Sequence, residues 1–316
     1  MKVAAIDIGT NSVLLLIAET QAGGELSPVL ERATITRLGE DVDRTRVLGE
    51  AARARTLACL GAYAKDLELH APERVAVVGT SALRDAGGGP EFTEDAERLL
   101  GVRPLVISGQ REAELTFRGT LSGLGLEGHV AVFDVGGGST EIVVGNTATT
   151  TSAASSARTP PSIESATSLD IGSVRLFERH VRTDPPTRHE IDDVRHAVDA
   201  ALLAEPAIPG DAALVGVAGT VTTLAAVARA IDPYDAARVH GARLELETIR
   251  AVVRRLTSVT LAERKQIPGL EPRRADVIVA GAVLVERLVT WSQKSEVVVS
   301  DRGVRWGLAE ELANGP

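Results

Sequence analysis

The 316 residues suit two domains of average size better than one small core. Apolar residues make up 44% and charged residues 24% of the chain, which are globular values that argue against wholesale disorder. The net charge of −9 gives no general attraction to nucleic acid or to an anionic membrane, and a single cysteine, Cys59, excludes an intramolecular disulfide.

The sequence shows no pattern that is typical of a membrane or secreted protein. No apolar run reaches the roughly 18 residues that a membrane span needs. The N-terminal stretch meets a charge at Asp7, which is too early for the apolar region of a signal peptide. We therefore expect a cytoplasmic protein.

Short apolar strands and amphipathic helices alternate along the first third of the chain. The first two strands are joined by the turn Gly9-Thr10-Asn11-Ser12, and leucines and alanines recur at helical spacing between residues 57 and 67. Strands are predicted at residues 3–8, 13–18, 26–36, 75–79 and 105–107. Helices are predicted at residues 50–69, 91–100 and 110–122.

The same pattern then starts again. Residues 130–133 are apolar, Asp134-Val135-Gly136-Gly137-Gly138-Ser139 forms a turn, and residues 140–145 are apolar again. Both passages read strand, aspartate, glycine-containing turn, strand, so we infer an internal duplication and two related domains. Strands that alternate with helices indicate an α/β fold.

The rest of the chain keeps this alternation. Thr187 followed by Glu190 is a capping-box signature, which opens a helix to about residue 204. Strands are predicted at residues 213–217 and 296–299, and helices at 220–230, 273–290 and 303–313. Residues 146–168 are rich in Thr, Ser, Ala and Pro, and we predict that they form an exposed polar loop.

Each of the two Asp-containing turns suits a phosphate ligand. A glycine-rich turn after a buried strand lets backbone N–H groups approach a phosphate, and the strand-end aspartate faces the same anion. Asp7 and Asp134 hold these positions. An aspartate beside a phosphate is repulsive unless a divalent cation lies between them, so the pair points to Mg²⁺. Two ordinary hairpins with glycines for positive φ are the alternative interpretation.

Several better-known motifs are excluded. None of the four lysines follows a glycine, so the chain has no P-loop. The residue three after Gly138 is Glu141, so the dinucleotide-binding fingerprint fails as well. No Gly-x-Ser-x-Gly and no His-Glu-x-x-His occurs, which removes the usual serine hydrolases and zincins.

Seven blocks of the sequence resemble, in order, the exopolyphosphatase/guanosine pentaphosphate phosphohydrolase (Ppx/GppA) family. The blocks are residues 7–12, 78–86, 107–115, 134–141, 169–176, 216–223 and 300–305. They span nearly the whole chain, which makes the resemblance far more specific than any one loop. Two departures occur: Gly87-Gly88-Gly89 stands where the family commonly has an Asn nearby, and the segment 146–168 is longer and more polar than the resemblance implies.

The resemblance implies an α/β fold of two actin-like ATPase (ribonuclease H-like) domains with the site in an interdomain cleft. The first domain would cover residues 1–126 plus 302–316, and the second would cover residues 127–301. Longer members of the family carry a further helical domain, whereas this chain stops at Pro316. We therefore expect a short form with a preference for short polyphosphates.

The resemblance also implies a role for each site residue. Glu112 would be the catalytic base that deprotonates the attacking water. Asp7, Asp134 and Glu141 would hold Mg²⁺ directly or through water, and the number of metal ions is left open. The predicted phosphate-binding residues are Gly9, Thr10, Asn11, Ser12, Arg84, Gly136, Gly137, Gly138, Ser139, Arg175, Gly219 and Thr220.

Each of the charged candidates also has an alternative interpretation without a role in the site. Glu112 is alternatively an exposed helix residue, and Glu141 a strand residue that faces solvent. Arg84 is alternatively part of a surface ion pair with Asp85 or another neighbour. Arg175 alternatively covers apolar surface with its aliphatic stem.

The expected reaction is Mg²⁺-dependent release of terminal phosphate from inorganic polyphosphate by in-line attack of water. Hydrolysis of pppGpp to ppGpp is the main alternative, because both substrates present terminal phosphoanhydrides. A kinase of the same superfamily would transfer phosphate to a small acceptor, and a polyphosphate or alarmone sensor would bind without turnover. We expect a polyanionic substrate and no nucleic-acid or membrane partner. The resemblance is also compatible with a homodimer, since dimers are common in that family.

Overall fold

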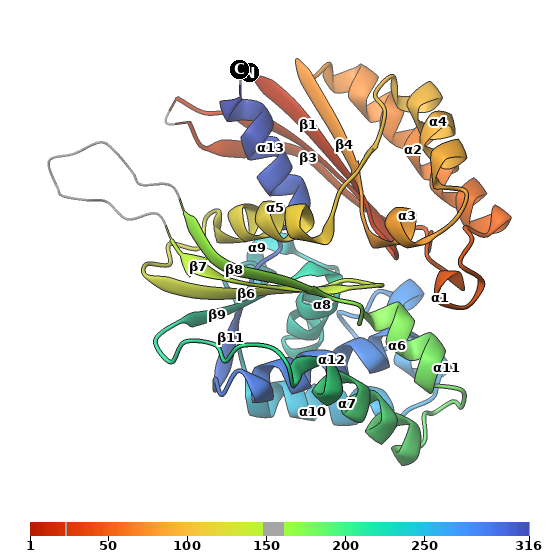
Figure 1. The fold of residues 1–316 in the computed structure, drawn as a ribbon, viewed down its shortest axis with the longest axis vertical. Coiled ribbons are helices and arrows are strands. Elements are labelled where there is room, and N and C mark those ends of the chain that lie inside the picture. The colour runs from red at the N-terminus through yellow and green to blue at the C-terminus, as the bar shows by residue number, and fades with distance from the viewer. Residues whose placement is uncertain (23, 148–160, 316) are drawn as a thin grey trace, which may run out of the picture. The chain divides into compact units, whose positions relative to one another are not determined.

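The computed structural model describes residues 1–22, 24–147 and 161–315, and the chain divides into two compact units (Figure 1). Unit 1 consists of Met1–Gly119 and Val304–Pro316, and unit 2 consists of Thr120–Gly303. The functional division into domains at residues 126 and 302, and the cleft between them, stay predictions.

Unit 1 is built on a five-stranded mixed sheet. Its strand order is β3-β2-β1-β4-β5, in which β1 pairs antiparallel with β2 and β2 antiparallel with β3, while β4 runs parallel to β1 and to β5. The strands are β1 (Lys2–Ile8), β2 (Ser12–Thr20), β3 (Leu26–Ile35), β4 (Arg74–Gly79) and β5 (Leu105–Val106).

Helices cover both faces of this sheet (Figure 1). Because side chains alternate along a strand, Ile6 points to one face and Ala5 to the other. Ile6 packs in a core with Leu60 of α2 (Glu50–His70) and Phe92 of α4 (Gly89–Leu100). Ala5 packs with residues of α5 (Gly109–Leu121) and α13 (Val304–Asn314). The short helices α1 (Val42–Thr45) and α3 (Ser81–Asp85) complete the unit.

Unit 2 repeats the topology of unit 1. In its six-stranded sheet, β8-β7-β6-β9-β11 follow the same order and the same strand directions, and β10 is added antiparallel to β11. The strands are β6 (His129–Val135), β7 (Thr140–Asn146), β8 (Ser162–Leu169), β9 (Ala213–Val217), β10 (Arg243–Glu245) and β11 (Glu296–Val299). The repeated topology confirms the predicted α/β fold of two actin-like (ribonuclease H-like) domains.

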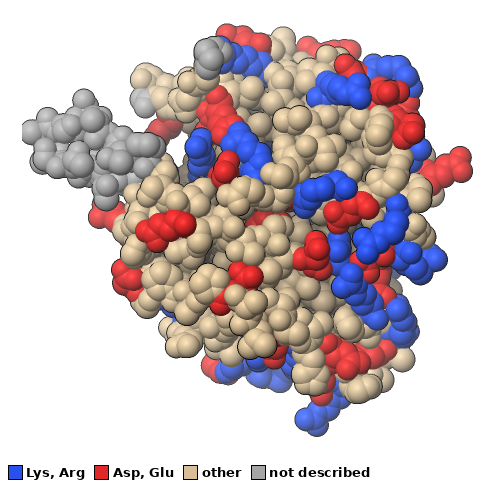
Figure 2. Space-filling view, viewed as in Figure 1, with Lys and Arg blue, Asp and Glu red and all other residues tan. Residues whose placement is uncertain are grey.

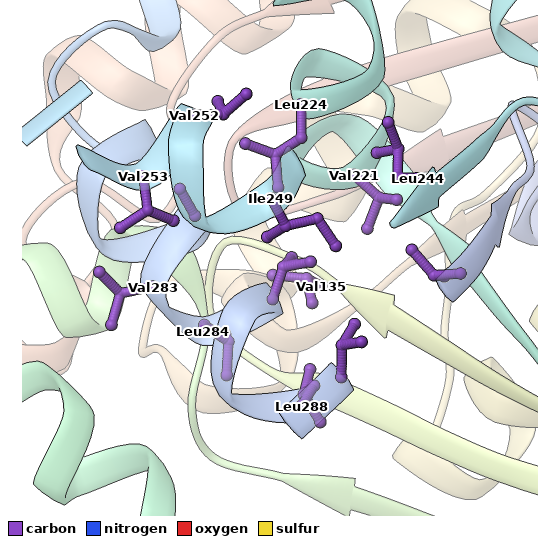
Figure 3. Packing of buried hydrophobic residues seen from close by; sticks show 14 of the residues in the cluster. Val135, Val221, Leu224, Leu244, Ile249, Val252, Val253, Val283, Leu284 and Leu288 are labelled. Atoms are coloured by element: carbon purple, nitrogen blue, oxygen red, sulfur yellow. The ribbon is translucent and has the colours of Figure 1, made fainter. Parts of the chain in front are cut away.

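Side chains from the helices of unit 2 pack against one face of the sheet and form a large core with it. Figure 3 shows Val135 of β6 in this core with Ile249 of α10 and Leu284 of α12. The predicted capping box is present, because Thr187 and Glu190 exchange both hydrogen bonds at the start of α7. The helices are α6 (Ser173–His180), α7 (Arg188–Leu202), α8 (Ala218–Ala228), α9 (Ala236–Val239), α10 (Leu246–Thr257), α11 (Leu261–Arg264), α12 (Ile278–Trp291) and the 3₁₀ turn η1 (Pro272–Arg274).

The prediction of a loop across residues 146–168 is wrong at its C-terminal end. Strand β8 pairs along β7 from Ser162 to Leu169. Its side chains are mostly small and polar, so the sequence lacks an apolar pattern, and the backbone ladder with β7 determines the strand. The part of the predicted loop at residues 148–160 lies outside the described residues.

The predicted helix at 273–290 begins later than expected. A 3₁₀ turn from Pro272 to Arg274 comes first, and α12 starts at Ile278. The prediction took the apolar run back to Pro272, whereas the proline begins a separate short turn with Glu271 as its cap.

Charged side chains are mixed on the molecular surface. On the face shown in Figure 2, basic and acidic side chains lie next to one another in small groups. Ion pairs occur among the charged side chains of the described residues, such as Arg250 with Glu247 and Arg195 with Asp192. No helix in the described parts of the chain combines the length and the apolar character that a membrane crossing requires.

Candidate active site

The two predicted phosphate turns are closed by the same backbone hydrogen bond. Gly9 N–H donates to Ser12 O at 3.0 Å, and Gly136 N–H donates to Ser139 O at 3.1 Å. A Cβ atom on either glycine would lie 3.1 Å from that same carbonyl oxygen, which is tighter than ordinary contact. Glycine is therefore favoured at the first position of each turn.

The carbonyl groups of each turn are held by the segment that follows the third strand of the unit. In unit 1, Gly39 N–H donates to Thr10 O at 2.9 Å, and Arg37 N–H donates to Asn11 O at 3.0 Å. A trans peptide places its N–H opposite its C=O. The N–H groups of Asn11 and Ser12 therefore point away from this segment, as a turn that binds phosphate requires.

In unit 2, the segment after the third strand also holds carbonyl groups of the turn. Ser173 N–H donates to Gly136 O and Val174 N–H donates to Gly137 O, both at 2.9 Å. These bonds turn the N–H groups of Gly137 and Gly138 away from the start of α6. Among the described residues no backbone carbonyl accepts a hydrogen bond from these two N–H groups.

A glycine after each third strand allows this close approach, and the sequence analysis did not select either one as a site residue. A Cβ on Gly39 would lie 2.3 Å from Thr10 Cγ2, and a Cβ on Gly172 would lie 2.4 Å from Gly137 O. Each glycine follows a buried aliphatic residue, Leu38 or Ile171. This repeated aliphatic-glycine pair is the sequence signal that could have found them.

Glu112 and Arg84 are brought together in unit 1. Glu112 lies in the first turn of α5 and is only 7% exposed. Arg84 Nη1 lies 3.1 Å from Glu112 Oε2 and donates to Ile107 O at 2.9 Å, whereas its contact with Asp85 is longer, at 3.9 Å. Glu112 is therefore a buried carboxylate whose charge is compensated and whose position is fixed by a guanidinium.

A buried hydroxyl pair fixes the first turn to the start of α3. Thr10 Oγ1 and Ser81 Oγ are 2.7 Å apart, and both side chains are buried. The Thr10 hydroxyl, predicted as a phosphate donor, is thus engaged within the protein. Ser81 was missed as a contact of the turn because it lies 71 residues away in sequence.

Asp134 and Glu141 lie side by side in unit 2. They occupy directly opposite positions on the antiparallel strands β6 and β7, and they are 8% and 1% exposed. Ser168 Oγ donates to Glu141 Oε1 at 2.7 Å. Two like charges in opposite positions are unfavourable, and carboxylate oxygens are the ligands that hard divalent cations prefer. The pair therefore fits a hard divalent cation, and the interpretation of Glu141 as a strand residue that faces solvent is wrong.

The third predicted metal ligand, Asp7, belongs to unit 1, where it is half-buried at the end of β1. Its strand partner on β2 is Leu14 and not a carboxylate. No cluster of three or more His, Cys, Asp or Glu side chains placed to hold a metal occurs within residues 1–22, 24–147 and 161–315. A ligand set that includes Asp7 stays a prediction.

The remaining predicted phosphate residues lie at helix starts in unit 2. Arg175 is buried in the first turn of α6, with Nη1 3.7 Å from Asp170 Oδ1. Thr220 is engaged within the protein, since its Oγ1 donates to Val135 O at 3.3 Å. Gly219 packs against Arg274, because a Cβ on Gly219 would lie 1.7 Å from Arg274 Nη1.

Arg274 is a residue of this region that the sequence analysis missed. Burial lowers the pKa of its guanidinium, whereas Tyr234, Glu271 and Asp301 act in the opposite direction. The signal was present as a pair of arginines after Pro272, but the prediction assigned them to the start of a long helix.

Comparisons with known proteins find relatives that match nearly the whole chain. Exopolyphosphatase 2 of Mycobacterium tuberculosis is 40% identical over 99% of this chain and 98% of that protein. A guanosine-5'-triphosphate,3'-diphosphate pyrophosphatase of Vibrio atlanticus is 28% identical over 98% of this chain and 59% of that longer protein.

A solved structure of an exopolyphosphatase-like protein superimposes with a TM-score of 0.87 at 36% identity, covering 98% of this chain and 97% of that one. The model of the Ppx/GppA phosphatase family matches residues 16–314. Together with the two turns and the carboxylates beside them, these matches show that the chain belongs to the Ppx/GppA phosphatase family.

Proposed function

We propose that this protein is an exopolyphosphatase, which releases the terminal phosphate of inorganic polyphosphate. The observation that carries the proposal is the pair of similar turns. In each turn, two backbone N–H groups point away from the segment that holds the turn carbonyls, and an aspartate lies beside them near the end of a strand. The end-to-end similarity to a protein named exopolyphosphatase supports the choice of substrate.

In the proposed reaction, a water oxygen attacks the terminal phosphorus in line with the bridging oxygen. The bond between that phosphorus and the bridging oxygen breaks, and the shortened chain leaves with the electron pair. Glu112 accepts the proton of the attacking water. Arg84 holds the Glu112 carboxylate in place, and we propose that it also contacts a non-bridging phosphate oxygen.

We propose Mg²⁺ as the cofactor, held by Asp134 and Glu141, with Asp7 as a further candidate ligand. A bound Mg²⁺ supplies neutralisation of the negative charge on the phosphate oxygens. The turn N–H groups of Gly137 and Gly138 bind phosphate oxygens in the same region of unit 2. Their position is fixed before substrate arrives, because the start of α6 holds the neighbouring carbonyls.

Hydrolysis of pppGpp is the second candidate. The similarity to a guanosine-5'-triphosphate,3'-diphosphate pyrophosphatase across 98% of this chain favours it. Both reactions use the same attack on a terminal phosphoanhydride, so the residues of the site do not separate them.

Phosphate release from a substrate panel tests the proposal. Purified protein is incubated with polyphosphate or pppGpp, each with Mg²⁺ or with EDTA, and inorganic phosphate is measured over time. We expect Mg²⁺-dependent release that is fastest with polyphosphate. Faster release from pppGpp, with ppGpp as the product, would select the second candidate. Absence of release from both substrates at millimolar Mg²⁺ would reject both.

A further inference from the structure

Three polar side chains form a row across the strands of unit 2. Asp134 on β6 is opposite Glu141 on β7, and Glu141 is opposite Ser168 on β8. Opposite residues of neighbouring strands share one face of a sheet, with Cβ atoms about 4.5–5.5 Å apart. The hydrogen bond from Ser168 Oγ to Glu141 Oε1, at 2.7 Å, joins β8 to β7.

Unit 1 shows that the fold does not require this polar row. The equivalent positions on β1, β2 and β3 are Asp7, Leu14 and Ala33. The same three-stranded arrangement therefore forms with Leu and Ala in place of Glu and Ser. The glutamate and the serine occur together in only one of the two related sheets, and they form a hydrogen bond with each other there.

We propose that Ser168 is a positioning residue that fixes the Glu141 carboxylate for the divalent cation. This inference rests on the proposed function, because the cation belongs to that reaction. Glu141 is almost fully buried, so its carboxylate depends on protein groups for orientation. A hydroxyl that donates to one carboxylate oxygen holds the side chain in one rotamer, and a fixed carboxylate is a better ligand for the ion.

The location of Ser168 makes it possible to distinguish a role in positioning Glu141 from a role in holding the fold together. Ser168 is exposed on β8, and among the described residues no strand pairs with the other edge of β8. Loss of its hydroxyl removes no core packing. We therefore expect its substitution to weaken metal binding while the protein still folds.

The test compares three variants with the wild-type protein. Ser168→Ala removes the hydroxyl, Ser168→Thr keeps it, and Ser165→Ala is a matched control at an exposed serine of the same strand, opposite Val144. Binding of Mn²⁺ to the substrate-free protein is measured by electron paramagnetic resonance of the free ion. The Mg²⁺ concentration that gives half-maximal phosphate release is measured in parallel, and thermal unfolding in EDTA reports on the fold.

Ser168→Ala is expected to weaken Mn²⁺ binding by about 10- to 100-fold and to raise the Mg²⁺ requirement by a similar factor. Ser168→Thr and Ser165→Ala are expected to bind Mn²⁺ like the wild type and to unfold at the wild-type temperature in EDTA. Ser168→Ala is expected to keep a cooperative unfolding transition in EDTA, at a lower temperature because a buried carboxylate has lost a hydrogen bond. Equal Mn²⁺ affinity in Ser168→Ala and wild type would overturn the inference. So would equal weakening in Ser168→Thr, or no Mn²⁺ binding by the wild type at millimolar concentration.

Failure of the inference and failure of the proposed function give different results. If wild type releases phosphate while Ser168→Ala keeps its metal affinity, the inference is wrong and the function stands. If wild type releases no phosphate from either substrate but the Mn²⁺ difference is found, the proposed function is wrong. The role of Ser168 at the metal site then stands.

Discussion

Arg84 Nη1 contacts Glu112 Oε2 at 3.1 Å and donates to Ile107 O at 2.9 Å, so one guanidinium group joins the proposed base to the end of the sheet. Glu112 is buried, and Arg84 retains partial exposure. The arginine therefore has a structural role and a solvent-accessible part from which we propose that it contacts phosphate.

The first prediction concerns the base. Glu112→Gln keeps the shape of the side chain and can still accept a hydrogen bond from Arg84, but it cannot take the proton of water. We expect kcat to fall by about 10²- to 10⁴-fold while KM changes little. Steady-state phosphate release measures both values. Retention of more than about a third of wild-type kcat would assign proton transfer to another group.

The second prediction concerns Arg84. Arg84→Ala leaves a buried carboxylate without its nearest cation, so we expect a loss of about 1–3 kcal/mol in the free energy of unfolding. The matched control is Arg32→Ala, which breaks the more exposed ion pair of Arg32 with Asp66 and should cost only about 0–1 kcal/mol. Urea unfolding followed by circular dichroism measures both. Equal losses in the two variants would contradict the role of Arg84 in holding Glu112.

The third prediction concerns the opposed carboxylates. In EDTA, Asp134→Asn removes the like-charge opposition to Glu141 and should raise the free energy of unfolding by about 0.2–1 kcal/mol. In saturating Mg²⁺ the wild type should be more stable than the variant, because the ion stabilises the wild type more. Thermal unfolding in both buffers tests this reversal. A variant with the same Mg²⁺-dependent shift as wild type would show that Asp134 does not hold the ion.

The fourth prediction concerns the glycine behind the second turn. In Gly172→Ala the new Cβ meets backbone atoms of Gly137 and Gly138, so the turn has to shift. We expect a loss of about 1–3 kcal/mol in stability together with a lower kcat/KM. Gly61→Ala is the control, because nothing lies within 4 Å of its Cβ position inside α2, and alanine there should stabilise by about 0.5–1 kcal/mol. A Gly172→Ala protein with normal stability and activity would contradict the tight packing of the turn.

The fifth prediction concerns pH. Hydrogen bonds to Asp211 and Glu164 raise the pKa of His129 above its ordinary value. A raised pKa means that the protonated form is favoured in the folded state. The stabilisation by His129 is thus fully present below the ordinary pKa of 6.5 and is lost as pH rises through the folded value.

The difference in unfolding free energy between wild type and His129→Gln should therefore shrink as pH rises above 6.5. Denaturation at a series of pH values, with His189→Gln as an exposed histidine control, measures it. A difference that is constant or that grows with pH would contradict the proposed interaction.

Much of the fold could be predicted from the sequence, because its buried strands are apolar runs between turn residues. The run before Asp7 and the run before Asp134 gave strands β1 and β6 within a residue or two of their observed bounds. Strand β8 could not be found in this way. Among the described residues it lies at the edge of its sheet and pairs with β7 alone, and its side chains are mostly small and polar.

Candidate site residues could be selected from the sequence where residue type and turn context indicate the chemistry. Contacts between distant segments were not. Thr10 meets Ser81, Glu141 meets Ser168, and Gly219 meets Arg274 only after the chain has folded. Partners of this kind depend on strand order and helix placement, which no local pattern contains.

The measurement that tests the central claim most directly is hydrolysis of polyphosphate in water enriched in ¹⁸O. If water attacks the terminal phosphorus, each released phosphate carries one ¹⁸O atom from solvent, and the shortened chain carries none. Mass spectrometry of both products decides this, with Glu112→Gln as the control for slow enzymatic turnover. Label found in the shortened chain, or phosphate released without label, would contradict attack of water on the terminal phosphorus.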